Sequence, residues 1–329
     1  MTSLSHEPFL AGWRYRALIY SVVLSALGYL GFALFGGWRE VAGALVQVGG
    51  TGLLLALLLS LVNYALRYLR WHLYLSTLGH RIPWRPGFQI YLAGFALTTT
   101  PGKAGEAFRG LLLKRRGVPY PDSFAAFFSE RLSDLIAIVL LTLLGLSLYP
   151  QAWPLILVGG LLCLGLLAML GWREGLLGLQ RRLPHLGRWQ RWVGHGFEIL
   201  LQAQRCHRPA LLLLATLLSL LGWTAEAFAF HLILDWMGVE ASFMFAAFVF
   251  ALAMLAGALS FTPGGLGSTE GVMAALLIWH GVAAPEAIAA TVLIRSTTLW
   301  FAVGLGVAAL ATTATEPPRE ARSEGNEDG

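Results

Sequence analysis

The chain has 329 residues, of which 57% are hydrophobic and only 12% are charged, and its mean hydropathy is +0.66. Soluble domains are about a quarter charged, so this composition excludes an ordinary soluble enzyme. Apolar stretches of about twenty residues recur along the chain, and such stretches are typical of membrane-spanning helices. We therefore expect an all-α polytopic membrane protein.

Basic residues outnumber acidic ones by 23 to 18, and a tail after Thr315 hides part of the excess. The tail holds two arginines and five acidic residues, so the rest of the chain carries 21 basic and 13 acidic residues. In a membrane protein this excess indicates cytoplasmic loops and contact with anionic lipid headgroups rather than with nucleic acid. We expect the tail, 311–329, to be disordered.

The predicted spans follow from these apolar stretches, and arginines set their orientation. Arg14 and Arg16 place the N-terminus, 1–16, in the cytoplasm, and the C-terminus is expected there as well. Arg67, Arg70, Arg81 and Arg85 follow the second span and are expected at the cytoplasmic surface. The six full spans are expected near 17–35, 50–66, 123–148, 155–170, 210–234 and 287–310, all within one transmembrane domain, 17–310.

Between the fourth and fifth spans, the segment 171–209 contains seven arginines and only two acidic residues, and we expect it in the cytoplasm. Trp189, Phe197 and Leu201 fall on one helical face of this segment, and Arg191 falls on the other. This pattern predicts an interfacial helix on the inner leaflet. The alternative is a plain positive-inside anchor without a role in substrate binding.

An internal repeat is the most informative feature of the sequence. The motif T-P-G-x-x-G occurs at Thr100 and again at Thr262, and a glutamate follows it in both places. Matches in the flanking segments keep the same order and predict a duplication, with repeat one near 50–149 and repeat two near 210–310. The flanking matches are His72 and Gly79 with His231 and Gly238, and Pro121 and Arg131 with Pro285 and Arg295. The residues that break the helices are Thr100, Pro101, Gly102 and Gly105 in repeat one and Thr262, Pro263, Gly264, Gly265 and Gly267 in repeat two.

Proline and glycine inside an apolar segment free backbone groups, which membranes tolerate only where protein or a wet cavity covers them. From Gly87 to Thr100 is fourteen residues, about 21 Å of helix against a bilayer core of about 30 Å. We therefore predict two re-entrant hairpins, of which the second would enter from the opposite side. Such an inverted repeat is typical of secondary transporters. The alternative is a pair of kinked full spans packed through glycine.

Charged residues within the apolar body cost about 2.5–3.5 kcal/mol each, so we expect them to face the protein interior or a wet cavity. The half-helix after the first break offers free N–H groups, and Arg109 can bind a phosphate bidentately. This combination predicts a phosphate site. The candidate substrate-binding residues are Lys103, Glu106, Arg109, Glu130, Arg131, Asp134, Glu270 and Arg295.

Several of these charges have more than one interpretation. Arg131 can pair with Asp134 at i,i+3 spacing, so this group is either a neutralised cluster near the interface or the wall of a headgroup cavity. Arg295 has no acidic residue within four positions, and its partner must come from elsewhere. Glu226 is either a proton or cation site or a glutamate hydrogen-bonded to a neighbouring helix. The scattered histidines and two cysteines predict no metal site and no cofactor.

Three elements carry a resemblance to a known family: G-x-x-G-E-x-x-R at Gly102–Arg109, E-R-x-x-D at Glu130–Asp134 and P-G-G-x-G at Pro263–Gly267. The chain resembles the lysylphosphatidylglycerol synthase transmembrane-region family, also called flippase-like domain proteins, from Leu18 to about Leu310. This resemblance implies a relation to the flippase part of the bacterial multiple peptide resistance factor. No synthase domain accompanies these spans, so we do not expect aminoacylation.

The leading functional hypothesis is a translocase for a lipid or lipid-linked precursor in the bacterial cytoplasmic (inner) membrane. Its expected partners are membrane lipids with anionic or phosphate-bearing headgroups, such as phospholipids or polyprenyl phosphates, and no nucleic acid. One alternative is a non-transporting partner of an envelope-lipid enzyme. Another is a membrane-embedded lipid transferase, in which Glu130 and Asp134 would be the only paired carboxylates. We do not expect an enzyme.

Overall fold

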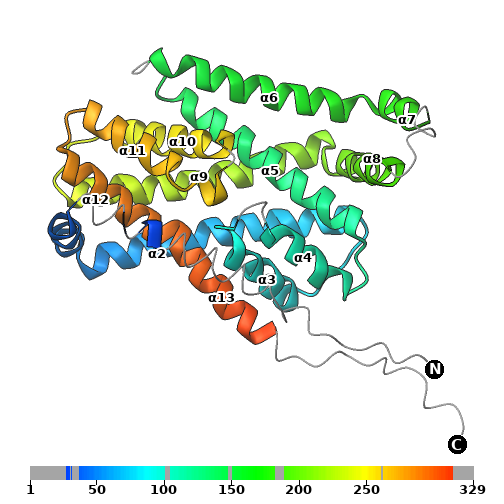
Figure 1. Ribbon diagram of the computed structural model, residues 1–329, viewed down its shortest axis with the longest axis horizontal. Coiled ribbons are helices and arrows are strands. Elements are labelled where there is room, and N and C mark those ends of the chain that lie inside the picture. Colours follow the sequence, from blue (N-terminus) through cyan, green and yellow to red (C-terminus); the bar gives the residue numbers. More distant parts are fainter. Residues whose placement is uncertain are drawn as a thin grey trace, which may run out of the picture.

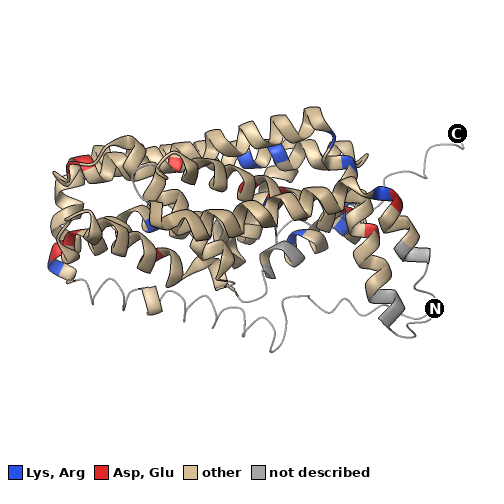
Figure 2. Cartoon of the chain, turned by 90° about the horizontal axis from the view of Figure 1, so that it is seen from above, with Lys and Arg blue, Asp and Glu red and all other residues tan. Residues whose placement is uncertain are grey.

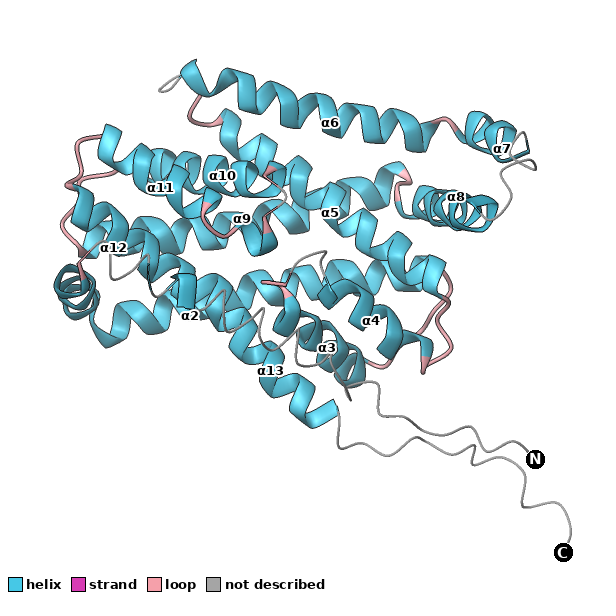
Figure 3. Cartoon of the chain, viewed as in Figure 1, coloured by secondary structure: helices cyan, strands magenta, loops and turns pink. Residues whose placement is uncertain are grey.

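The computed structural model describes residues 27–29, 31, 37–100, 104–146, 150–181, 189–260 and 262–313. The predicted first span and the acidic tail therefore lie almost entirely outside the described residues. Helices joined by short connections make up the described ranges (Figures 1 and 3). In chain order they are α2 (Trp38–Thr77), α3 (Trp84–Ala93), η1 (Gly94–Leu97), α4 (Ala104–Lys114), α5 (Tyr120–Leu143), η3 (Pro150–Ala152), α6 (Trp153–Gly171), α7 (Arg173–Arg181), α8 (Trp189–Cys206), α9 (Pro209–Trp236), α10 (Phe243–Leu259), η4 (Pro263–Gly265), α11 (Ser268–Trp279), α12 (Ala284–Arg295), η5 (Ser296–Trp300) and α13 (Phe301–Thr313).

Within the described residues, four helices are long and apolar enough to cross a membrane: α2, η3–α6, α9 and the continuous α12–α13. They correspond to four of the predicted spans. The 24-residue α5 matches a fifth, but it buries Glu130 and Asp134 in the protein interior. Figure 1 shows α2, α6 and α9 running along the long axis of the molecule, and α5 crossing it obliquely. The chain is thus an all-helical, multi-pass membrane protein, and the count of six full spans stays a prediction.

The second predicted span begins as expected but ends differently. The backbone of α2 bends at Gly49, which has a φ of 66°, so its long arm starts at Gly50. That arm continues to Thr77 instead of ending at Leu66. The prediction that Arg67 and Arg70 lie at the cytoplasmic surface is therefore wrong, because both side chains enter the protein interior, where acidic residues of α5 pair with them.

Short helices flank each predicted break. Before the first break, α3 and η1 together span fourteen residues, and the eleven-residue α4 follows it. At about 1.5 Å per residue, neither arm reaches across a bilayer core of about 30 Å. Gly105 lies so close to the other arm that a Cβ there would come within 2.3 Å of the Gly94 carbonyl oxygen. Pro101, Gly102 and Lys103 lie outside the described residues, so the turn itself and its membrane depth stay predictions.

The two sequence repeats end their first helices in the same way. After α2, Gly79 has a φ of 98°, and the His80 N–H donates to the Leu75 carbonyl at 2.9 Å. After α9, Gly238 has a φ of 75°, and the Val239 N–H donates to the Leu234 carbonyl at 2.9 Å. Glycine is the residue that this left-handed helix cap favours. The order α2, α3, α4, α5 around the first break is repeated by α9, α10, α11, α12 around the second, which supports the duplication.

The basic segment forms two helices, α7 and α8, that lie across the long helices and are seen nearly end-on in Figure 1. The apolar face of α8 does not face lipid throughout. Phe197 is buried, and Leu200 packs against a hydrophobic cluster that includes residues of α2 and α5. Arg188 and the side chains of Trp189, Arg191 and Trp192 lie outside the described residues. The predicted interfacial helix therefore also anchors the basic segment to the protein.

Exposed charge differs between the two ends of the bundle. The loops after α2 and α4 and the segment from α7 to α9 carry exposed arginines and lysine, which gather toward one end in Figure 2. The loops at the other end carry mainly acidic residues. The exposed basic residues at the first end are Arg81, Arg85, Lys114, Arg115, Arg116, Arg173, Arg205 and Arg208. The exposed charged residues at the other end are Glu40, Asp235, Glu240 and Glu286, with one exposed arginine, Arg39.

A close helix crossing supplies the first prediction. At Gly306 of α13, a Cβ would lie 2.2 Å from the Ala96 nitrogen of η1, whereas a Cβ at Gly304 would meet nothing within 4 Å. Gly306→Ala should therefore lower the free energy of unfolding by about 1–3 kcal/mol, as overpacking does. Gly304→Ala is the matched control and should leave stability unchanged or slightly higher. Thermal unfolding in detergent measures both, and equal stability of the two variants would contradict this close approach of α13 to η1.

Candidate functional site

Six charged residues from three helices meet in the interior of the first repeat. We call them the arginine cluster: Arg67 and Arg70 of α2, Arg109 of α4, and Glu130, Arg131 and Asp134 of α5. Spacings of three and four residues place the members on a single face of α2 and of α5. The structure thus brings together four residues that the sequence predicted and two that it placed at the surface.

Asp134 is the most heavily paired member of the arginine cluster. Its carboxylate lies 2.6 Å from Arg70 Nη1, 3.2 Å from Arg131 Nη2 and 3.5 Å from Arg67 Nη2. The indole N–H of Trp223, from α9, also donates to Asp134 Oδ1 at 3.1 Å. The i,i+3 pair predicted between Arg131 and Asp134 is therefore present, but it is one part of a larger network.

Glu130 is fully buried and links α5 to the first broken segment. Its Oε2 lies 3.2 Å from Arg109 Nη1, and its Oε1 lies 3.8 Å from Arg70 Nη2. The Tyr91 hydroxyl of α3 donates to Oε1 at 3.2 Å. The guanidinium carbon of Arg109 lies 5.0 Å from the centre of the Tyr91 ring, a cation–π distance. Glu130 thereby holds both arms of the first broken segment against α5.

The charges of the arginine cluster do not balance. Four guanidinium groups meet two carboxylates, and the buried Nε atoms of Arg67, Arg70 and Arg131 have no hydrogen-bond partner. The side chain of Glu106 and all of Lys103 lie outside the described residues, so this balance concerns the described side chains. Unpaired buried charge is costly, and a site with spare guanidinium donors is suited to an anion. Arg131 is the most accessible of the four, with its side chain 34% exposed.

The second repeat contains a smaller and neutral centre. Arg295 Nε lies 2.7 Å from Glu270 Oε1, and both side chains are buried. Arg295 Nη2 donates to the Gly264 carbonyl at 2.9 Å, and Glu270 Oε2 accepts from the Gly267 N–H at 2.7 Å. Glu270 is thus the partner that Arg295 lacked along its own helix. The pair ties α11 and α12 to the glycines of the second break, and its predicted role in substrate binding stays a prediction.

Glu226 of α9 is buried between these two centres. Arg67 of the arginine cluster and Arg295 of the second centre both attract its carboxylate, and Asp134 repels it. Tyr64 lies one turn from Arg67 on α2. Its hydroxyl donates to the Thr298 carbonyl of η5 and so links the first repeat to the second. Charges from both repeats therefore act on the Glu226 carboxylate.

Sequence reasoning missed Arg67, Arg70, Tyr91, Ser219 and Trp223. Ser219 of α9 accepts from Arg70 Nη1, and Trp223 lies one helical turn further on. A signal for the two arginines was present, because a polar stripe at helical spacing continues beyond Leu66. Its members are Ser60, Asn63, Arg67, Arg70 and Tyr74, all of which lie on the inner face of α2.

Comparison with known proteins is consistent with this arrangement. The profile of the family described as "Lysylphosphatidylglycerol synthase TM region" matches residues 18–306. The chain belongs to this family. The match confirms the resemblance seen in the sequence motifs, and it covers both the arginine cluster and the second centre.

The chain is also similar to individual proteins of two archaea. Two proteins of Methanothermobacter thermautotrophicus, both described as "UPF0104 membrane protein", are 28% and 30% identical to this chain. Those matches cover 88% and 92% of this chain and 93% and 96% of the relatives. A shorter match, 29% identical over 125 residues, is to the glycosyltransferase AglD of Haloferax volcanii, and it covers 37% of this chain and 20% of that protein. The chain is therefore a multi-pass protein of a family of prokaryotic membrane proteins.

The pairing of Asp134 supplies a second prediction. Asp134→Asn should lower the free energy of unfolding by about 3–5 kcal/mol, because it leaves buried arginines without their counter-charge. Glu198→Gln is the control, since Glu198 is 51% exposed and faces His195 at 3.3 Å; this change should cost no more than about 1 kcal/mol. Unfolding in mixed micelles with increasing SDS, followed by circular dichroism, measures both. Equal losses would show that the Asp134 network does not stabilise the fold.

Proposed function

We propose that this chain is a translocase for a membrane lipid or lipid-linked precursor and that it binds a phosphate-bearing headgroup at the arginine cluster. The observation that carries this proposal is the charge balance among the described side chains of that cluster, where four guanidinium groups meet two carboxylates. A headgroup phosphate would supply the missing negative charge. Arginine suits this role because its planar guanidinium can bind two phosphate oxygens at once.

The position of the cluster favours a lipid over a soluble anion. It lies among helices of a membrane protein, against the broken segment formed by α3, η1 and α4. If that segment is re-entrant, the cluster faces a wet cavity at membrane depth while the acyl chains stay in lipid. The family description also refers to a phosphate-bearing lipid, lysylphosphatidylglycerol.

Alternating access would follow from the duplication. The two broken segments would form an inverted repeat, and rocking of one repeat against the other would expose the headgroup first to one side and then to the other. The basic end of the bundle would face the cytoplasm by the positive-inside rule, which places both termini there, and the membrane would be the bacterial inner membrane. The second centre, Glu270 with Arg295, would keep its break rigid during this movement.

A lipid transferase is the second candidate, and the partial match to a glycosyltransferase favours it. Glu130 and Asp134 would be its paired carboxylates. Both carboxylates already pair with buried arginines at 2.6–3.8 Å, so a catalytic role would require each of them to leave those contacts. The translocase therefore remains the better-supported proposal. A non-transporting partner of an envelope-lipid enzyme would use the same cluster to hold its lipid.

The proposal is tested by headgroup flux in proteoliposomes with lysyl-phosphatidylglycerol, phosphatidylglycerol and undecaprenyl phosphate. The wild-type protein should move at least one of these lipids. Arg109→Ala should reduce that flux at least about tenfold, because it removes one charge-assisted contact to the phosphate. Arg115→Ala, an exposed arginine just after the same helix, is the matched control and should retain flux.

Two further measurements make this result decisive. Arg109→Lys keeps the charge and should recover part of the flux, and thermal unfolding should show that all variants are folded. Arg295→Ala should also lose flux, but together with stability, because Arg295 is bound to Glu270 and Gly264. Absence of flux for every lipid in a folded, correctly inserted wild-type protein would overturn the translocase proposal.

Glu226 provides a separate prediction about energy coupling. If it is a proton site, Glu226→Gln should keep headgroup flux down a lipid gradient but abolish the dependence of flux on an imposed pH gradient. If it is only a structural glutamate, Glu226→Gln should leave that dependence unchanged. The control is Glu198→Gln, which alters an exposed carboxylate on α8. Flux measured with and without a pH gradient distinguishes the two interpretations.

A further inference from the structure

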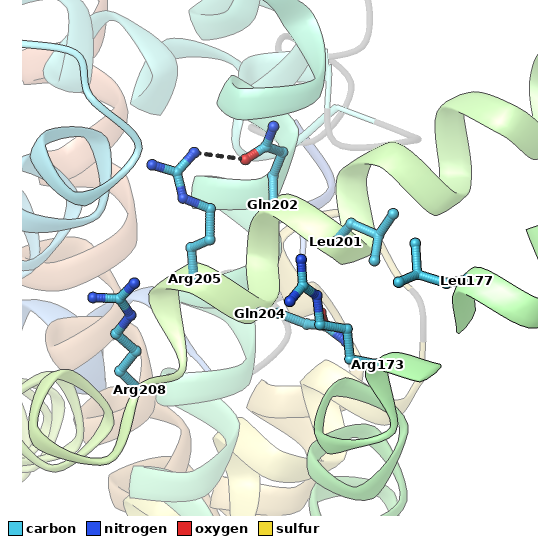
Figure 4. Close-up of a pocket in the computed structure, with 7 residues that line it drawn as sticks. All are labelled: Arg173, Leu177, Leu201, Gln202, Gln204, Arg205 and Arg208. Carbon is cyan, nitrogen blue, oxygen red and sulfur yellow. Dashed lines mark hydrogen bonds between the residues drawn. The ribbon is translucent and has the colours of Figure 1, made fainter. Parts of the chain in front are cut away.

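A pocket lined by arginines lies between α7 and α8 at the basic end of the molecule. Its volume is about 530 Å³, within the range typical of small-molecule sites. Arg173 comes from the start of α7, and Arg205 and Arg208 come from the junction of α8 with α9 (Figure 4). Leu177 and Leu201 form an apolar part of the wall. The described carboxylates of α7 and α8, Glu174 and Glu198, are exposed and do not line this pocket.

The polar lining of the pocket is partly fixed in place. Arg205 donates from Nη1 to Gln202 Oε1 at 3.0 Å and from Nη2 to the Thr77 carbonyl at 3.1 Å. Gln204 contributes a buried Nε2 that has no hydrogen-bond partner. Burial lowers the pKa of the neighbouring His207, so the positive charge at neutral pH comes from the arginines. The pocket therefore offers three cations and a spare amide donor without a lining carboxylate.

We propose that this pocket is a second binding site, separate from the arginine cluster, for the anionic phosphate-bearing headgroup of a membrane lipid. The arginines and the Gln204 amide would bind the phosphate, and Leu177 and Leu201 would contact the glycerol and the first methylenes of the acyl chains. Because α7 and α8 lie across the long helices, at the basic end that the positive-inside rule assigns to the cytoplasm, the pocket would lie at the level of the headgroups of the cytoplasmic leaflet. The choice of ligand rests on the proposed function, but binding at the pocket can be measured without transport.

The pocket is connected to the arginine cluster through α2. Arg205 binds the carbonyl of Thr77, the last residue of α2, and Arg70 lies seven residues earlier on the same helix. Seven residues of helix correspond to about 10 Å, or about two turns. A lipid held at the pocket would therefore have its headgroup a short distance from the end of the helix that supplies two members of the cluster.

A fluorophore placed at the pocket tests this proposal locally. The full-length Leu177→Cys variant in detergent would be labelled with a bimane. Native cysteines should not react, because Cys163 is buried and burial raises the pKa of the Cys206 thiol to about 12. Dihexanoyl-phosphatidylglycerol should give a saturable fluorescence change, whereas the zwitterionic dihexanoyl-phosphatidylcholine should bind more weakly. Leu201→Cys provides a second label position if the first variant fails to fold.

Paired substitutions separate the pocket from general surface charge. Arg173→Gln with Arg208→Gln should weaken phosphatidylglycerol binding at least about tenfold, because charge-assisted contacts are lost. Arg81→Gln with Arg115→Gln removes two exposed arginines from the same end, outside the pocket, and should change affinity less than about twofold, as expected for screened surface charge. Equal weakening by both pairs, or no saturable signal in the wild type, would overturn the proposal.

Two more arms identify the ligand and keep the two proposals apart. Inorganic phosphate should compete only at much higher concentration than the lipid, and competition at equal concentration would assign the pocket to a free anion instead. Arg109→Ala, which should reduce flux at least about tenfold, should leave the fluorescence titration at the pocket unchanged. If the wild-type protein moves a lipid but shows no binding at the pocket, the second site alone is refuted. If the wild-type protein binds phosphatidylglycerol at the pocket but moves no lipid, the translocase proposal alone is refuted.

Discussion

The fold depends on the neutralisation of buried arginines by two carboxylates of α5. An arginine inside a membrane protein is tolerated only if it is paired, and Asp134 and Glu130 pair with guanidinium groups from α2 and α4. Trp223 of α9 and Tyr91 of α3 complete the coordination of the same carboxylates. Five helices are thereby held in register by polar contacts, in a setting where apolar packing alone discriminates weakly between helix arrangements because lipid is equally apolar.

The two repeats carry a glutamate and an arginine at corresponding positions, but the contacts of these residues differ between the repeats. Each places a glutamate just after its Pro/Gly break and an arginine on the second helix after that break. In the second half this pair is closed, because Arg295 binds both Glu270 and the carbonyl of Gly264. In the first half, Arg131 joins a larger cluster in which arginines are in excess. The second half is therefore suited to fixing the geometry of a break, and the first is suited to holding an anion.

The sequence predicted the helices better than the site. The apolar runs predicted four helices that are long enough to cross a membrane, and Gly79 and Gly238, which match between the sequence repeats, end α2 and α9 in the structure. Arg67 and Arg70 could not be placed in the same way, because arginines after an apolar run ordinarily lie at the interface. Only the carboxylates of α5, more than sixty residues away, make their burial favourable. The pairing of Glu270 with Arg295 is likewise a contact between two helices, so spacing rules within one helix could not predict it.

Partial neutralisation is what a translocation site for an anion requires. If every arginine of the cluster were paired, a phosphate would gain little on entering, and if none were paired, the helices could not be held in the membrane. The described side chains of the cluster hold two carboxylates and four guanidinium groups. In the proposed translocase, a headgroup would compete for donors that Asp134 and Glu130 do not use, and both carboxylates would pair with the arginines again when it leaves. Binding can then be strong enough to draw a headgroup from the interface and weak enough to release it, as permeation through any membrane pathway demands.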